Sequence, residues 1–141
     1  MERTFREGQP VRSDTVVYIV DDDESVRRAL RRLVESLGMR AETFSSPAEY
    51  LGSDVDLQSS CLLLDVQLPG MDGFELHRRI VDAGSAPPVI FITGRPDAET
   101  RTKAAKADAV AYLEKPFDDR RLLAALQGAL DRITGGPASP G

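Results

Sequence analysis

The chain has 141 residues, of which 41% are hydrophobic, and this size suits one domain with its own core rather than a multidomain enzyme. The 18 Lys and Arg residues against 23 Asp and Glu residues give a formal net charge of -5, which argues against nucleic-acid contact by this chain. A single cysteine excludes an internal disulfide framework and a cysteine-based zinc site. Because the start lacks the apolar run of a signal peptide and no apolar run could cross a bilayer, we expect a cytoplasmic protein without membrane contact.

The two ends of the chain lack the hydrophobic pattern of the middle. Residues 1–14 mix charged residues with glycine and proline, and residues 134–141 are small residues and prolines after an initial threonine. We therefore expect a flexible N-terminal extension over 1–14, one folded domain over 15–133, and a flexible tail or the start of a linker over 134–141.

Short apolar runs alternate with amphipathic stretches along the folded domain. Five runs are apolar at nearly every position, as in a parallel sheet that is buried on both faces, and these are Val16–Val20, Ala41–Phe44, Cys61–Leu64, Val89–Ile92 and Ala109–Leu113. Helical spacing or capping signals predict five helices, over Val26–Leu37, from Ser46-Pro47 to Leu51, from Asp72 or Gly73 to about Ala83, from Pro96-Asp97 to about Ala107, and from Asp118 to Ile133. This order predicts an α/β fold with helices on both faces of a parallel sheet.

A sheet of this kind places its ligands beyond the carboxyl ends of its strands. The residues that follow four of the predicted strands are polar and chemically compatible, and they are Asp21 and Asp22, Asp65, Thr93, and Lys115. Clustered carboxylates suit a hard divalent cation such as Mg²⁺, and a lysine and a threonine beside them suit a phosphoryl group. An aspartate can also be the nucleophile in phosphoryl transfer, and Asp65 stands alone at the end of a central strand.

Each of these residues also has an ordinary structural interpretation. Asp23 or Glu24, taken alone, is more often a cap of the following helix than a ligand. Lys115 alone could be a solvated loop lysine, and Thr93 could bond to its own backbone. The complete set at the ends of four strands favours the functional interpretation.

Four motifs carry a resemblance to a known family. They are Val-Asp-Asp-Asp at 20–23, Leu-Asp-Val-Gln-Leu-Pro-Gly-Met-Asp-Gly at 64–73, Phe-Ile-Thr-Gly at 91–94 and Tyr-Leu-Glu-Lys-Pro-Phe at 112–117. Over about residues 15–133 the chain resembles the CheY-like receiver domain of two-component response regulators, especially the receivers of LuxR-type, FixJ-like transcription regulators. The resemblance implies a flavodoxin-like (βα)5 fold with strand order 2-1-3-4-5.

The resemblance also implies a Mg-dependent reaction in which Asp65 accepts a phosphoryl group from the phosphohistidine of a sensor histidine kinase. Asp21, Asp22 and Asp65, with the backbone carbonyl of Gln67, become the ligands of Mg²⁺ or Mn²⁺, and Asp22 is favoured as the direct ligand of the acidic pair. Lys115 is expected to pair with Asp65 and then with the phosphoryl group. The chain is then a signalling domain, and its only catalysis is self-catalysed phosphotransfer and autodephosphorylation.

A switch is implied by the same resemblance. Thr93 is expected to bond to a phosphoryl oxygen, Tyr112 to turn inward when Thr93 moves, and Gln67 and Arg95 to tune the lifetime of the acyl phosphate. The readout surface is expected on the helix over 96–107, the strand over 109–113 and the helix from Asp118, where a phosphorylation-dependent homodimer could form.

Two alternative functions differ from this one in class. A haloacid-dehalogenase-type phosphatase also uses a strand-end aspartate but requires a second aspartate two positions later, where this chain has Gln67. A pseudo-receiver that only binds partners conflicts with the complete set of acidic, threonine and lysine residues. We also expect His77 and Cys61 to be packing residues. Whether a DNA-binding domain follows Gly141 in the native protein stays open.

Overall fold

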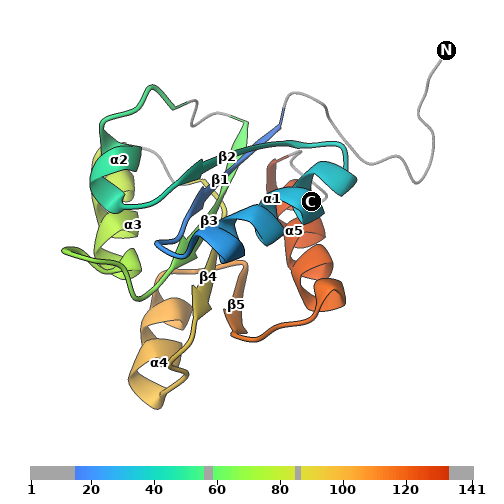
Figure 1. The fold of residues 1–141 in the computed structure, drawn as a ribbon. Helices are drawn as coiled ribbons and strands as arrows, with labels where there is room; N and C mark the ends of the chain where they lie inside the picture. Colours follow the sequence, from blue (N-terminus) through green and yellow to red (C-terminus); the bar gives the residue numbers. More distant parts are fainter. Residues whose placement is uncertain (1–14, 56–58, 85–86, 134–141) are drawn as a thin grey trace, which may run out of the picture.

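The computed structural model describes residues 15–55, 59–84 and 87–133, so the extension expected at 1–14 and the tail expected at 134–141 lie outside the described residues. Strands and helices alternate along the chain (Figure 1). The strands are β1 (Val16–Val20), β2 (Arg40–Phe44), β3 (Ser60–Asp65), β4 (Val89–Thr93) and β5 (Ala111–Glu114). The helices are α1 (Glu24–Ser36), α2 (Pro47–Leu51), α3 (Gly73–Asp82), α4 (Ala98–Lys106) and α5 (Asp119–Ile133).

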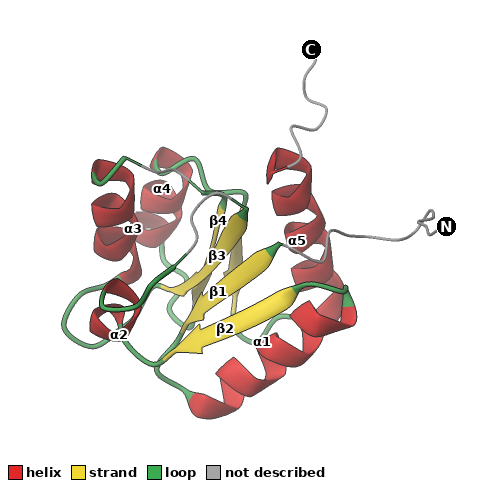
Figure 2. Ribbon diagram, turned by 90° about the horizontal axis from the view of Figure 1, so that it is seen from above, coloured by secondary structure: helices red, strands yellow, loops and turns green. Residues whose placement is uncertain are grey.

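The strands form one parallel sheet, as the apolar runs predicted, in the order β2-β1-β3-β4-β5 that the resemblance to receiver domains implied. Helices α1 and α5 cover one face of this sheet, and α2, α3 and α4 cover the other (Figure 2). With this order, β1, β3, β4 and β5 are consecutive neighbours. The carboxyl ends of the strands that carry the predicted site residues therefore lie side by side.

Both faces of the sheet carry a hydrophobic core, because successive side chains of a strand point to opposite faces. On β1, Val17 and Ile19 are fully buried against the side of α1 and α5, whereas Val16, Tyr18 and Val20 face the other helices. Each fully buried side chain of this size contributes about 1.5–3 kcal/mol. The two cores hold the strand ends in fixed register.

Polar side chains cap the starts of all five described helices, and at α5 the carboxylate of Asp118 accepts a hydrogen bond from the N–H of Arg121 at 2.8 Å. Asp23, Ser46, Asp72 and Asp97 each accept a hydrogen bond from a backbone N–H in the first turn of the helix that follows. Such a cap contributes about 1 kcal/mol. The capping interpretation of Asp23 is therefore confirmed, and the hydrogen bonds from Ser25 and Val26 to its carboxylate lower the pKa of Asp23.

The turn before β5 differs from the prediction. The strand was expected to begin at Ala109, but it begins at Ala111, because the N–H of Ala109 donates to the carbonyl of Ala104 at the end of α4. Asp108, in the same turn, has a left-handed backbone with φ 57°. This conformation is accessible to Asp but suits Gly better.

Candidate functional site

Three carboxylates meet at the carboxyl ends of β1 and β3. Asp21 and Asp22 follow β1, Asp65 ends β3, and one carboxylate oxygen from each lies within 4.8 Å of the others. Asp21 and Asp65 are only 1% and 3% exposed, whereas Asp22 is exposed to solvent. This arrangement of oxygen ligands with one open side suits a hard divalent cation that keeps some of its water.

Lys115, which follows β5, is the cation of this cluster. Its Nζ lies 3.0 Å from Asp21 Oδ2 and 3.2 Å from Asp65 Oδ2. Three ionised carboxylates against one ammonium leave two negative charges uncompensated within the cluster. A divalent cation would balance that excess, so the donor set fits Mg²⁺ or Mn²⁺ in charge as well as in chemistry.

The pKa values of the cluster follow from its burial. Burial and the neighbouring Asp21 charge raise the pKa of Asp65 to about 6, although Lys115 and the N–H of Gln67 oppose the shift. Burial alone would lower the pKa of Lys115, but its contacts with Asp21 and Asp65 outweigh burial and raise it. Near neutral pH, Asp65 is therefore mainly an anion held beside an ammonium, as a carboxylate nucleophile requires.

Backbone groups fix the two buried carboxylates. Asp21 Oδ1 accepts a hydrogen bond from the N–H of Asp23 at 2.9 Å, and Asp65 Oδ1 accepts one from the N–H of Gln67 at 3.0 Å. Helix α3 begins so close to β3 that a Cβ at Gly73 would overlap the carbonyl oxygen of Asp65. Glycine at this position lets the start of α3 pack directly against the strand end.

Thr93 lies at the end of β4 and is fully buried. Its Oγ1 donates a hydrogen bond to the side-chain carbonyl Oε1 of Gln67 at 3.0 Å and accepts one from the N–H of Arg95 at 2.9 Å. The N–H of Gly94 donates to the same Gln67 Oε1 at 3.2 Å. The sequence predicted that Gln67 and Thr93 both belong to the site, but it did not predict this contact between them.

Tyr112 and Arg95 complete the predicted set. Tyr112 pairs with Phe91 in the register of β5 and β4, and its hydroxyl is buried without a hydrogen-bond partner among the described residues. Burial raises the pKa of this hydroxyl. Arg95 is exposed, and its backbone rather than its side chain contacts Thr93.

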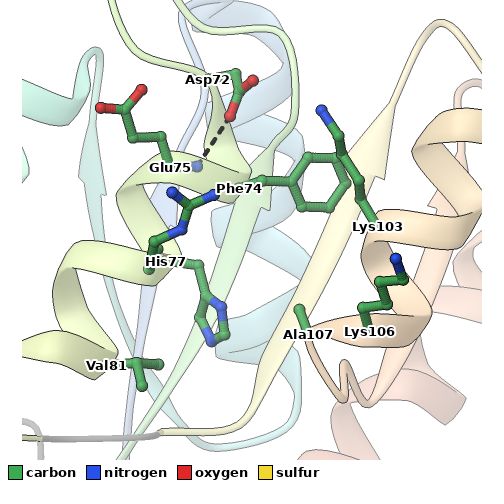
Figure 3. Close-up of a pocket in the computed structure, with 9 residues that line it drawn as sticks. Asp72, Phe74, Glu75, His77, Val81, Lys103, Lys106 and Ala107 are labelled. Carbon is green, nitrogen blue, oxygen red and sulfur yellow. Dashed lines mark hydrogen bonds between the residues drawn. The ribbon is translucent and has the colours of Figure 1, made fainter.

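A separate groove of about 480 Å³ lies between α3 and α4 (Figure 3). Phe74 and His77 of α3 face Lys103 and Lys106 of α4 across it, and the Lys103 Nζ lies 5.9 Å from the centroid of the Phe74 ring. The buried His77 ring packs edge-on against Phe91, and its burial lowers the pKa of His77. His77 is thus a packing residue, as predicted, and the groove contains none of the strand-end carboxylates.

Cys61 is likewise a buried core residue, and burial raises the pKa of its thiol to about 12. Such a thiol stays protonated and unreactive at neutral pH, which agrees with its predicted role in packing. Among the helices of residues 15–55, 59–84 and 87–133, none has the length and apolar character needed to span a membrane.

Comparison with known proteins places the site in a family. Residues 17–127 match the response regulator receiver domain. The response regulator protein TmoT of Ectopseudomonas mendocina is 42% identical over 117 residues, which cover 83% of this chain and 53% of TmoT. The transcriptional regulatory protein FixJ of Azorhizobium caulinodans is 38% identical over 116 residues, which cover 82% of this chain and 55% of FixJ. This chain therefore spans about half the length of these curated relatives.

The solved structures agree with the sequence comparison. The BeF3-activated DrrB receiver domain superposes with a TM-score of 0.74 and 31% identity, covering 83% of this chain and 97% of that one. The two chains thus share the (βα)5 receiver fold that the strand-end motifs of this sequence implied. The chain belongs to the response regulator receiver domain family of two-component signalling.

Proposed function

We propose that Asp65 is the phosphoacceptor of this domain and that the donor is the phosphohistidine of a sensor histidine kinase. The observation that carries this proposal is the placement of the buried Asp65 carboxylate, 3.2 Å from Lys115 Nζ and within 4.8 Å of Asp21 and Asp22. A carboxylate oxygen of Asp65 attacks phosphorus, the bond between phosphorus and the histidine nitrogen breaks, and the electron pair returns to the imidazole, which takes up a proton. The product is an acyl phosphate.

Asp21, Asp22 and Asp65 would hold Mg²⁺ or Mn²⁺ together with the backbone carbonyl of Gln67. When bound, the metal ion would neutralise charge on the incoming phosphoryl group. Lys115 holds Asp65 in place before transfer and offers a positive charge to the phosphoryl oxygens after it. Self-catalysed phosphotransfer and the later hydrolysis of the acyl phosphate are the only reactions that we assign to this chain.

The new dianion on Asp65 would then act as the switch. Thr93 would donate its hydroxyl hydrogen bond to a phosphoryl oxygen, and Tyr112 of β5 would turn inward when Thr93 moves. Helix α4, strand β5 and helix α5 carry the change to the surface, where a homodimer or an output domain reads it. Arg95 and Gln67 border the site and are the residues that we expect to tune the lifetime of the acyl phosphate.

The proposed domain spans residues 15–133, functions in the cytoplasm and makes no contact with nucleic acid or membrane itself. The acidic balance of the chain and its single free cysteine support this assignment. Any DNA-binding output would reside in a separate domain of the protein.

Intact mass spectrometry after incubation with acetyl phosphate and Mg²⁺ tests the acceptor. We expect the chain to gain one phosphoryl group, and Asp65→Asn to gain none. Asp82→Asn is a matched control, because Asp82 is an exposed aspartate at the end of α3. If Asp65→Asn is labelled as fully as the control, Asp65 is not the acceptor; if the unaltered chain gains no group, it behaves as a pseudo-receiver.

A further inference from the structure

Gln67 holds the end of β4 through its side chain. One oxygen, Oε1, accepts a hydrogen bond from Thr93 Oγ1 at 3.0 Å and another from the N–H of Gly94 at 3.2 Å. Its own backbone N–H donates to Asp65 Oδ1 at 3.0 Å. Gln67 thus connects the carboxylate of Asp65 to the buried hydroxyl of Thr93.

The two groups that donate to Gln67 Oε1, the Thr93 hydroxyl and the Gly94 N–H, each have only one hydrogen. A hydroxyl and a backbone N–H each carry one proton, so a hydrogen bond to Gln67 Oε1 competes with any hydrogen bond to a phosphoryl oxygen on Asp65. Thr93 is fully buried, and its Oγ1 also accepts a hydrogen bond from the N–H of Arg95. This contact orients the hydroxyl so that its one proton points toward Gln67. While these hydrogen bonds to the Gln67 carboxamide persist, neither Thr93 nor Gly94 can donate the same hydrogen to a phosphoryl oxygen.

We propose that Gln67 is a positioning residue that competes with the phosphoryl group for Thr93 and Gly94, and so stabilises the unphosphorylated arrangement of the domain. This inference rests on the proposed function of Asp65. It assigns Gln67 an effect on the switch equilibrium, which is separate from any effect on the rate of acyl phosphate hydrolysis.

A cavity beside Gln67 can accept its side chain when a phosphoryl group displaces it. A cavity of about 230 Å³ adjoins Gln67 and is bordered by Arg95 and by Thr100 and Lys103 of α4. The backbone of Gln67 stays anchored by its hydrogen bond to Asp65, so only side-chain torsions need to change. Rotation of Gln67 into this cavity would link the release of Thr93 to the surface of α4.

Beryllofluoride with Mg²⁺ is the probe for the equilibrium, because it imitates a phosphoryl group on a carboxylate but leaves no acyl phosphate to hydrolyse. Gln67→Leu keeps a side chain of similar size without the acceptor. We expect this variant to bind beryllofluoride about 2- to 10-fold more tightly than the unaltered chain, which corresponds to the loss of ordinary neutral hydrogen bonds. Gln127→Leu, which alters an exposed glutamine of α5, is the matched control and should leave the affinity unchanged.

Amide NMR of the unliganded proteins gives a second readout. The Gly94 amide proton should shift and exchange faster with solvent in Gln67→Leu, whereas Gln67→Glu, which keeps an acceptor at the same reach, should preserve its protection. If Gln67→Leu binds beryllofluoride with unchanged or weaker affinity, the proposal that Gln67 competes with the phosphoryl group is wrong. If the unaltered chain does not bind beryllofluoride at all, the proposed function fails, and the Gly94 readout still shows whether Gln67 holds β4.

Discussion

Lys115 Nζ lies 3.0 Å from Asp21 Oδ2, although the two residues are separated by 94 positions in the sequence. In the sheet, β1 and β5 are not neighbours, because β3 and β4 lie between them. Lys115 therefore spans the carboxyl edge of the sheet and balances part of the charge at its centre. Among the described residues, Lys115 supplies the ammonium that pairs with the buried carboxylates of Asp21 and Asp65 and offsets part of the cost of burying them.

Replacement of Lys115 by methionine should destabilise the metal-free protein. The change keeps an apolar side chain but leaves the buried carboxylates of Asp21 and Asp65 without their cation, so we expect the free energy of unfolding at pH 7 to fall by about 1–3 kcal/mol. Urea denaturation in the presence of a chelator measures this difference. Lys103→Met, which removes an exposed ion pair with Glu99, should cost less than about 0.5 kcal/mol, and equal losses in both variants would contradict the argument.

Asp65→Asn should have the opposite effect on stability. Burial and the Asp21 charge raise the pKa of Asp65 from 3.8 to about 6. Between these two pH values the carboxyl keeps its proton in the folded state but has lost it in the unfolded state. The ionised carboxyl therefore lowers stability as the pH rises from about 4 through 6. At pH 7 in chelator, we expect Asp65→Asn to unfold with a free energy about 1–3 kcal/mol higher than the unaltered chain.

The pH dependence distinguishes this effect from a general gain in packing. The advantage of Asp65→Asn should shrink as the pH falls through 6 and vanish below about pH 3, where the Asp65 carboxyl of the unaltered chain is protonated in both the folded and the unfolded state. Urea denaturation at several pH values measures it. An advantage that does not vary with pH would show that the charge of Asp65 is not its cause.

Gly73→Ala should damage the site through the backbone. A Cβ at this position would overlap the carbonyl oxygen of Asp65, so β3 and the start of α3 must move apart, at a cost of about 1–3 kcal/mol. Thermal unfolding measures the loss, and Mg²⁺ affinity reports the displacement of Asp65. Gly52→Ala is the matched control, because the nearest atom to its Cβ is an ordinary 3.4 Å away; a similar loss there would refute the steric argument.

Tyr50→Phe should stabilise the fold slightly. Tyr50 is 2% exposed, its ring packs against Tyr18 and Phe44, and its hydroxyl has no hydrogen-bond partner among the described residues. Removal of the unpaired hydroxyl should raise the free energy of unfolding by up to about 1 kcal/mol, whereas Tyr50→Ala should lower it by about 3–5 kcal/mol. A loss of stability in Tyr50→Phe, measured by urea denaturation, would indicate that the hydroxyl is bonded in solution.

The strand-end residues were predictable because the fold leaves them few alternatives. A strand buried on both faces must be apolar throughout, so its first charged residue, such as Asp65 after Leu64, marks the point where the chain reaches the edge of the sheet. Parallel strands bring those points together. The positions of Asp21, Thr93 and Lys115 follow from the same constraint, and all lie at the predicted edge.

The contact between Gln67 and Thr93 was not predictable in this way. Gln67 lies in an irregular loop, and the direction of its side chain depends on where the end of β4 is placed, 26 residues later in the sequence. Glutamine two positions after Asp65 was visible in the sequence as a neighbour of the site, but nothing in the pattern indicated its hydrogen-bond partner. The start of β5 was similarly misplaced, because the left-handed turn at Asp108 is set by local backbone bonding rather than by hydrophobicity.

The order of the strands also determines when the site can exist during synthesis. Asp21 and Asp65 emerge early from the ribosome, but Lys115 belongs to the last strand and joins the sheet only through β4. A nascent chain that has reached Thr93 carries the carboxylates without the ammonium that balances them. The complete set of strand-end residues therefore comes together only when β5 has paired with β4.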